Sequence, residues 1–167
     1  MAREFFVPGS IMTGSGALDA SADTLKKMGK KALIVTDAMM VELGNCAKVE
    51  RVLEHAKVGY SVFDRIGGEP TDVMVKDGLE QYKREGCDFL VGLGGGSPLD
   101  TMKSIAVLSS DGGEDITVYM GKEISAAVPP MVAIPTTAGT GSEATQFSII
   151  NDTRNNIKML LKGKVML

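Results

Sequence analysis

The sequence predicts an α/β fold: a Rossmann-like parallel sheet flanked by helices, followed by a C-terminal β-hairpin. Apolar runs of strand length alternate with segments of helical spacing, as expected for consecutive βαβ units. One of these runs, Phe89 to Leu93, leads directly into three consecutive glycines. The chain has 167 residues, 44% of them hydrophobic and 23% charged, which suffices for one core. We therefore expect a single domain over residues 1–167.

Helix and strand patterns alternate along the first half of the chain. Leu18, Ala22 and Leu25 predict one amphipathic helix that ends near Gly29, before a buried strand from Ala32 to Thr36. A short strand, Tyr60 to Phe63, separates two further helices, the second with Thr71 as its N-cap. Their apolar residues recur at i, i+3, i+4 and i+7: Val49, Val52, Leu53 and Ala56 in one, Val75, Gly78, Leu79 and Tyr82 in the other.

The second half contains two strands that precede polar loops, and then a hairpin. Phe89 to Leu93 and Met131 to Ile134 read as buried strands. The helix after the glycines buries Leu99, Met102, Ile105 and Ala106. Residues 144–150 and 157–161 alternate as strands around a turn rich in Asn and Asp, which predicts a β-hairpin.

The glycine loop has the chemistry of a phosphate cradle. Gly94, Gly95 and Gly96 let main-chain N–H groups approach an anion, and the following helix start adds unpaired donors and a positive dipole end. Ser97 is predicted as the N-cap and Asp100 as the N3 partner. Many helices in α/β proteins begin with such residues, so a purely structural turn is the alternative.

A second polar segment supports the ligand interpretation. It follows the strand that ends near Ile134, and its hydroxyls can bind ribose or phosphate oxygens. The hydroxyl residues that we select are Thr136, Thr137, Thr140, Ser142 and Thr145. Few structural loops need so many hydroxyls.

Asp37 is the acidic residue that follows the first predicted strand. Ligands of open parallel sheets lie beyond the carboxyl ends of the strands, where this carboxylate could accept hydrogen bonds from both ribose hydroxyls of an adenosine. It would also repel a 2′-phosphate, which favours NAD over NADP. The structural alternative is an N-cap for the segment that begins at Ala38.

Two contiguous motifs resemble those of the iron-dependent (group III) alcohol dehydrogenase family. They are GGGS-x-x-D-x-x-K-x-x-A, beginning at Gly94, and P-T-T-A-G-T-G-S-E-x-T, beginning at Pro135. The resemblance implies that Gly95, Gly96 and Ser97 contact the pyrophosphate and that the five hydroxyl residues surround the ribose and nicotinamide. It also implies that Lys158 reaches the nicotinamide ribose; the alternative is an exposed strand lysine. Asp100 and Lys103 are interpreted as structural, Lys103 on a solvated helix face.

The same resemblance implies what the remainder of the protein does. Family members bind Fe2+ or Zn2+ through one Asp and three His, which would lie beyond residue 167, in a helical domain absent from this chain. We expect the full-length enzyme to interconvert alcohols and aldehydes or ketones with NAD, while this NAD(P)-binding fragment alone is inactive. The single histidine, His55, is expected to face solvent. The alternative is a non-catalytic module that binds NAD or a nucleotide phosphate.

The composition limits the kinds of partner that we expect for this protein. A net charge of −3 without a basic cluster argues against a nucleic-acid surface. No apolar run reaches membrane-spanning length, and the start Met1 to Gly9 breaks too early for a signal peptide, so we expect a cytoplasmic protein. Cys46 and Cys87 are predicted to be reduced thiols. The family resemblance implies a homodimer or higher homo-oligomer, and the apolar run Phe5 to Val7 suits an edge strand at such an interface.

Overall fold

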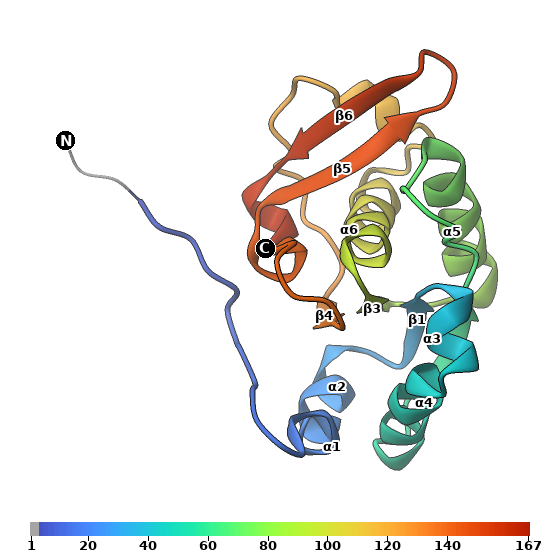
Figure 1. Ribbon diagram of the computed structural model, residues 1–167, viewed down its shortest axis with the longest axis vertical. Coiled ribbons are helices and arrows are strands. Elements are labelled where there is room, and N and C mark those ends of the chain that lie inside the picture. The colour runs from blue at the N-terminus through green and yellow to red at the C-terminus, as the bar shows by residue number, and fades with distance from the viewer. Residues whose placement is uncertain (1–3) are drawn as a thin grey trace.

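The computed structural model describes residues 4–167 and confirms the predicted parallel sheet (Figure 1). Met1 to Arg3, on which the signal-peptide prediction partly rests, lie outside this range. The strand order is β2-β1-β3-β4, with all pairs parallel. The strands are β1 (Lys31–Val35), β2 (Gly59–Phe63), β3 (Phe89–Gly94) and β4 (Met131–Pro135). Every residue of β3 is buried, as expected for a central strand covered on both faces.

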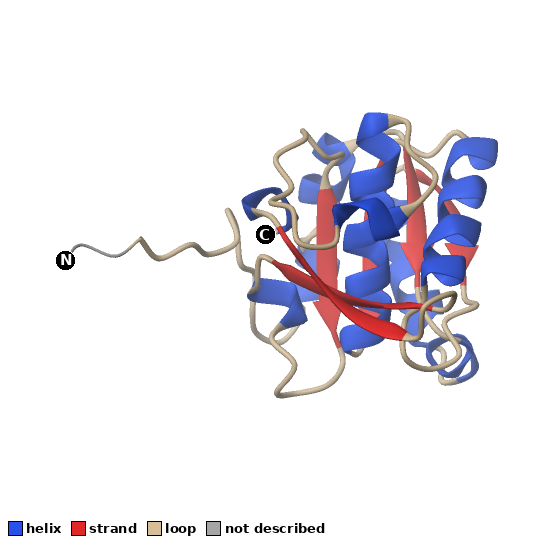
Figure 2. Ribbon diagram, turned by 90° about the horizontal axis from the view of Figure 1, so that it is seen from above, coloured by secondary structure: helices blue, strands red, loops and turns tan. Residues whose placement is uncertain are grey.

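Helices cover both faces of this sheet. On one face lie α1 (Ala17–Ala20), α2 (Ala22–Met28), α3 (Ala38–Glu42) and α4 (Asn45–His55), and on the other α5 (Asp72–Glu85) and α6 (Gly96–Asp111), as Figures 1 and 2 show. Successive side chains of a strand point to opposite faces, so Ile34 packs in one core and Leu33 in the other.

The first predicted helix is divided in two. Ser21 ends α1, with its N–H and its hydroxyl both donating to the carbonyl of Leu18, the hydroxyl at 2.6 Å. A serine that bonds to the preceding turn competes with the helical hydrogen-bond ladder, and α2 then begins at Ala22. The prediction of one continuous helix was therefore wrong, whereas the N-cap at Thr71 is confirmed by its bond from Met74 N.

The hairpin is confirmed and forms a further layer over α6 (Figure 1). It pairs β5 (Phe147–Asp152) antiparallel with β6 (Ile157–Lys162). Asp152 stabilises the turn, because its Oδ1 accepts from Arg154 N and its Oδ2 from Asn155 Nδ2. Three 3-10 turns complete the described chain: η1 (Ile116–Tyr119), η2 (Ser142–Ala144) and η3 (Lys164–Met166).

Two further expectations concern the cysteines and the N-terminal apolar run. Both cysteines are free, in agreement with the sequence, and the structure buries both. Phe5, Phe6 and Val7 are exposed and belong to neither a helix nor a strand, so the chain as described does not show the predicted edge strand. Across residues 4–167, none of the helices has both the length and the apolar character to cross a bilayer.

Candidate cofactor site

The carboxyl ends of three adjacent strands bring the predicted site segments together. Asp37 follows β1, Gly94 ends β3, and Thr136 follows β4. Two hydrogen bonds tie these ends to one another: Thr36 Oγ1 donates to Leu93 O at 2.8 Å, and Thr136 N donates to Gly94 O at 2.9 Å. The site segments therefore share the sheet edge where open parallel sheets bind ligands.

The three glycines lie so close to the other two segments that a side chain would touch them. A Cβ built on Gly94 would lie 3.3 Å from Asp37 Oδ2, and one on Gly95 would lie 3.3 Å from Thr137 Oγ1. A Cβ on Gly96 would lie 3.3 Å from Ser142 Oγ. Each glycine thus faces a different predicted ligand group across a gap that only a bare backbone leaves open.

The helix begins two residues earlier than predicted. α6 starts at Gly96 with Gly95 as its N-cap in extended conformation, and the cap makes no side-chain hydrogen bond. Ser97 lies inside the first turn, so its prediction as N-cap was wrong. The first-turn N–H groups consequently meet no capping side chain, which suits a helix start that receives an anion.

The structure shows one of the two roles that the sequence left open for Asp37, that of an N-cap. Its Oδ1 accepts a hydrogen bond from Met40 N at 2.9 Å and so caps α3. Its Oδ2 would lie 3.3 Å from a Cβ built on Gly94. Oδ1 of Asp37 therefore caps α3, and Oδ2 faces the glycine loop.

The hydroxyl segment winds over the glycine loop with its threonines toward solvent. Thr136, Thr137 and Thr140 are exposed, while Ser142 is buried and Thr145 is half-buried. The segment turns at Gly139 and Gly141, whose φ angles of 104° and 69° favour glycine. The exposed hydroxyls are accessible to a ligand lying along the sheet edge.

The side chain of Lys158 contacts Glu69 and not the glycine loop. It is exposed, and its Nζ donates to Glu69 Oε1 at 2.8 Å, while Glu69 Oε2 accepts from Asn151 Nδ2 at 2.9 Å. The hydrogen bond from Lys158 holds the pKa of the Glu69 carboxyl below its usual range. Because Glu69 lies in the connection from β2 to α5, this pair sits at the same carboxyl edge as the site.

Asp100 and Lys103 differ most from their sequence interpretation. Lys103 is 2% exposed rather than solvated, and its Nζ donates to Thr145 O at 2.6 Å and Phe147 O at 3.1 Å. Asp100 does not cap the helix; its Oδ2 accepts from Ile149 N at 3.0 Å. Burial raises the pKa of Asp100 and lowers that of Lys103 to about 8.

One sequence signal could have revealed this burial. Ala106, Val107 and Leu108 are consecutive apolar residues, which an amphipathic helix with one solvated face would not carry. All three are fully buried, because the sheet covers α6 on one side and the hairpin on the other. Charged residues on a helix enclosed in this way must be buried too.

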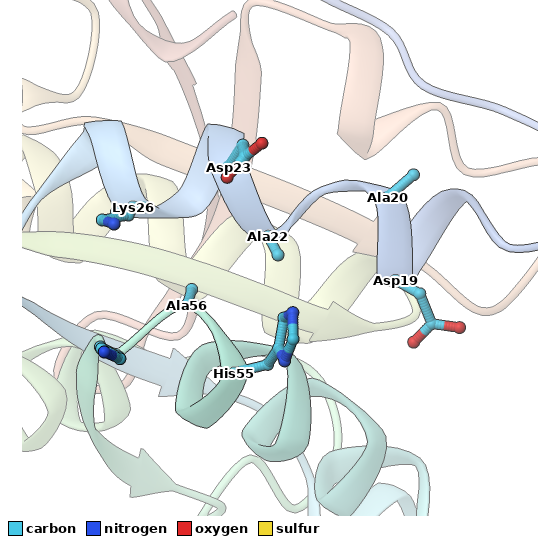
Figure 3. Close-up of a pocket in the computed structure, with 8 residues that line it drawn as sticks. Asp19, Ala20, Ala22, Asp23, Lys26, His55 and Ala56 are labelled. Atoms are coloured by element: carbon cyan, nitrogen blue, oxygen red, sulfur yellow. The ribbon is translucent and has the colours of Figure 1, made fainter.

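The described residues offer no alternative metal centre. Nowhere in residues 4–167 do three or more His, Cys, Asp or Glu side chains converge as metal ligands. His55 is exposed, as predicted, and lines a hollow of about 270 Å³ with Asp19, Asp23 and Lys26 (Figure 3). Because α4 ends there and β2 begins at Gly59, this hollow lies at the amino ends of the strands, opposite the candidate site.

Comparison with known proteins identifies the family. The family model described as "Iron-containing alcohol dehydrogenase" matches residues 8–167. The chain belongs to the iron-containing alcohol dehydrogenase family. It is 40% identical to the NAD-dependent methanol dehydrogenase of Bacillus methanolicus over 157 residues, which cover 93% of this chain and 41% of the relative.

Solved structures of family members agree with the fold. The crystal structure of a 1,3-propanediol oxidoreductase has a TM-score of 0.95 and 33% identity, covering 100% of this chain and 44% of the other. A sulfoacetaldehyde reductase from Bifidobacterium kashiwanohense, solved in complex with NAD+, has a TM-score of 0.89 and 27% identity, covering 100% and 44%. This chain of the iron-containing alcohol dehydrogenase family thus spans less than half the length of these relatives and corresponds to their N-terminal domain.

Proposed function

We propose that this chain is the NAD-binding domain of a longer, two-domain alcohol dehydrogenase, and that residues 1–167 form that domain. One observation carries the proposal: the glycine loop, Asp37 and the hydroxyl segment converge at one sheet edge, where a Cβ built on each glycine would lie 3.3 Å from Asp37 Oδ2 or from a hydroxyl oxygen of the segment. A backbone cradle with an uncapped helix start, a carboxylate and several hydroxyls is the donor and acceptor set that a dinucleotide requires.

Each group has a proposed place along the cofactor. Gly94, Gly95, Gly96 and Ser97 hold the pyrophosphate at the start of α6, and Asp37 Oδ2 accepts from the adenosine ribose. The hydroxyls surround the nicotinamide ribose and the ring: Thr136, Thr137, Thr140, Ser142 and Thr145. Lys158 reaches the same ribose once it exchanges Glu69 for the ligand, which costs little because exposed ion pairs are weak.

The reaction that we propose for the whole protein is reversible oxidation of a small alcohol to an aldehyde or ketone. NAD accepts the hydride when bound, and a divalent metal, Fe2+ or Zn2+, held outside these residues polarises the substrate oxygen. This chain binds and orients the cofactor, so that alone it binds NAD without turnover. We further propose that the whole enzyme is cytoplasmic and a homodimer or higher homo-oligomer.

The experiment that tests this is calorimetric titration of the chain with NAD and, separately, with NADP. We expect NAD to bind and NADP to bind at least about tenfold more weakly, because Asp37 repels the 2′-phosphate. Asp37→Asn keeps an oxygen for the α3 cap but removes the charge, so it should narrow this difference without unfolding the chain. Absence of NAD binding to the folded wild-type chain would refute the proposal.

A further inference from the structure

Arg65 lies beside Asp37 at the carboxyl edge of the sheet, and the cofactor-binding groups proposed above do not include it. The two residues form an isolated antiparallel bridge, each of them two residues beyond the end of its strand, β1 or β2. Residues that face each other in such a bridge carry their side chains on the same side, with Cβ atoms about 4.5–5.5 Å apart. An extended arginine side chain is longer than that separation. The Arg65 guanidinium can therefore reach the space around the Asp37 carboxylate.

The Arg65 side chain lies on the face of the sheet that α5 covers. Its Cζ is 4.9 Å from the centroid of the Phe63 ring, and its Nη1 is 3.8 Å from Asp77 Oδ2 on α5. Asp64 is directed to the opposite face by the alternation of the strand. Burial is the main cause that raises the pKa of the Cys46 thiol on α4, and the charge of Asp64 adds to it, in agreement with that direction. The carboxylate next to Arg65 in sequence thus lies away from the guanidinium.

The present contacts of Arg65 hold it loosely. The distance of 3.8 Å to Asp77 exceeds the length of a hydrogen bond, and the two side chains are 58% and 43% exposed. Exposed ion pairs of this kind are weak. Among residues 4–167, Asp77 is the only carboxylate within 4 Å of the guanidinium, so Asp37 does not neutralise it. A ligand anion can consequently replace Asp77 at little cost.

The chain that follows Arg65 leaves room for a ligand group. A Cβ built on Gly67 or on Gly68 would meet no heavy atom within 4 Å. On the other side of this space, Asp37 uses Oδ1 to cap α3 and directs Oδ2 toward the glycine loop. The proposed position of the adenosine ribose therefore adjoins both a carboxylate oxygen and an exposed cation.

These two charges act in opposite directions on the 2′ position of the ribose. A carboxylate accepts a hydrogen bond from the 2′-hydroxyl of NAD and repels a 2′-phosphate, whereas a nearby arginine accommodates the 2′-phosphate of NADP. The planar guanidinium donates two parallel hydrogen bonds to phosphate oxygens, and both bonds are charge-assisted. Arg65 thus has the chemistry that a 2′-phosphate requires, next to the residue that repels it.

We propose that Arg65 is a specificity-determining residue of the cofactor site, which turns from Asp77 to bind the 2′-phosphate of NADP. Asp37 favours NAD and Arg65 limits that preference, so the chain accepts both dinucleotides and binds NADP more weakly. This rests on the proposed function, because the 2′ group reaches Arg65 only if the adenosine ribose lies at Asp37.

The test titrates Arg65→Gln calorimetrically with NAD and, separately, with NADP. Arg84→Gln is the matched control, because it removes the same charge from an arginine that is 66% exposed and pairs with Glu85 at the C-terminal end of α5. We expect Arg65→Gln to weaken NADP binding by about tenfold, as for the loss of charge-assisted hydrogen bonds, and to leave NAD binding within about twofold. Arg84→Gln should change neither affinity.

Asp37→Asn provides a second background in which NADP binds more tightly and is measured more easily. Removing the carboxylate charge leaves Arg65 as the charged side chain beside the 2′-phosphate. Adding Arg65→Gln to Asp37→Asn should therefore again lower NADP affinity by about tenfold, with NAD affinity unchanged. Thermal unfolding, followed by circular dichroism, verifies that each variant is folded.

Four outcomes would count against the inference. Equal NADP affinity of Arg65→Gln and Arg84→Gln, while wild type binds NAD, would overturn the role of Arg65 and leave the proposed function standing. A parallel loss of NAD and NADP affinity in Arg65→Gln would also overturn it, because the effect would not depend on the 2′-phosphate. So would the absence of NADP binding to folded Asp37→Asn. If the wild-type chain binds neither dinucleotide, the proposed function itself fails.

Discussion

Substituting Gly95 with alanine tests the cofactor site at the point where the geometry is most restrictive. The backbone at Gly95 has φ −78° and ψ −160°, which any residue can adopt, so the substitution introduces no backbone strain. The new Cβ would lie 3.3 Å from Thr137 Oγ1 and 3.5 Å from Thr137 Cγ2, a contact that an exposed threonine relieves by moving a few tenths of an ångström. Loss of glycine also reduces the entropy of the unfolded chain. We therefore expect the unfolding free energy to change by less than about 1 kcal/mol.

Cofactor binding should respond much more strongly. The methyl group occupies the gap between the glycine loop and Thr137, through which the pyrophosphate would approach the first-turn N–H groups of α6 in the proposed binding mode. Losing one hydrogen bond to a charged group costs about 1.5–3 kcal/mol, which corresponds to about a tenfold to hundredfold rise in Kd.

The assay is calorimetric titration with NAD at one pH and salt concentration, with thermal unfolding followed by circular dichroism. Gly59→Ala is the control, because its Cβ makes an ordinary 3.4 Å contact with Lys31 Cγ at the amino end of β2. That variant should bind NAD as wild type does. Equal NAD affinity of Gly95→Ala and Gly59→Ala would refute the assignment of the glycine loop to the pyrophosphate.

Three further outcomes are expected. Thr71→Ala should lower the unfolding free energy by about 1 kcal/mol in urea titration, since it removes the side-chain acceptor of Met74 N at the start of α5; an unchanged midpoint would contradict this. Gly163→Ala should cost about 1–3 kcal/mol by the same measurement, because its Cβ would lie 2.8 Å from Ile124 Cβ, and a neutral result would show that this contact relaxes freely. The folded pKa of Lys103, about 8, is below its ordinary value of 10.5, so the unfolded chain binds more protons between these values and stability rises with pH there. This contribution of at most about 3 kcal/mol should be absent from Lys103→Met, and identical pH dependence in the two proteins would refute it.

Much of the fold was predictable because its signals are local. The strands follow from short apolar runs, and the start of α5 follows from Thr71 after Pro70, since caps and turns depend on neighbouring residues. The two wrong predictions of helix ends depended on competition between local signals. Ser97 has the chemistry of an N-cap, yet Gly95 in extended conformation starts α6 earlier; Ser21 interrupts a helix that apolar spacing alone predicts as continuous.

The candidate site was predictable as a set of residues but not as an arrangement. Residue types and spacing indicated the glycine loop, Asp37 and the hydroxyl segment, because consecutive glycines, a carboxylate after a strand and a run of hydroxyls can be recognised in the sequence. Their mutual distances depend on the order β2-β1-β3-β4, which brings together strand ends separated by many residues. The contact between Lys158 and Glu69 could not be predicted from sequence spacing, because it joins the second hairpin strand to the connection after β2.

The sequence by itself determined the alternating βαβ pattern, the two loop motifs and the family that they resemble, because periodicity, turn chemistry and motif spacing all lie within short stretches of chain. Tertiary structure decided which face each helix covers and which loops meet. It also decided that Lys103 is enclosed between the sheet and the hairpin rather than solvated. The physical reason is that burial depends on what packs over a residue, and here the covering layer comes from more than 40 residues further along the chain.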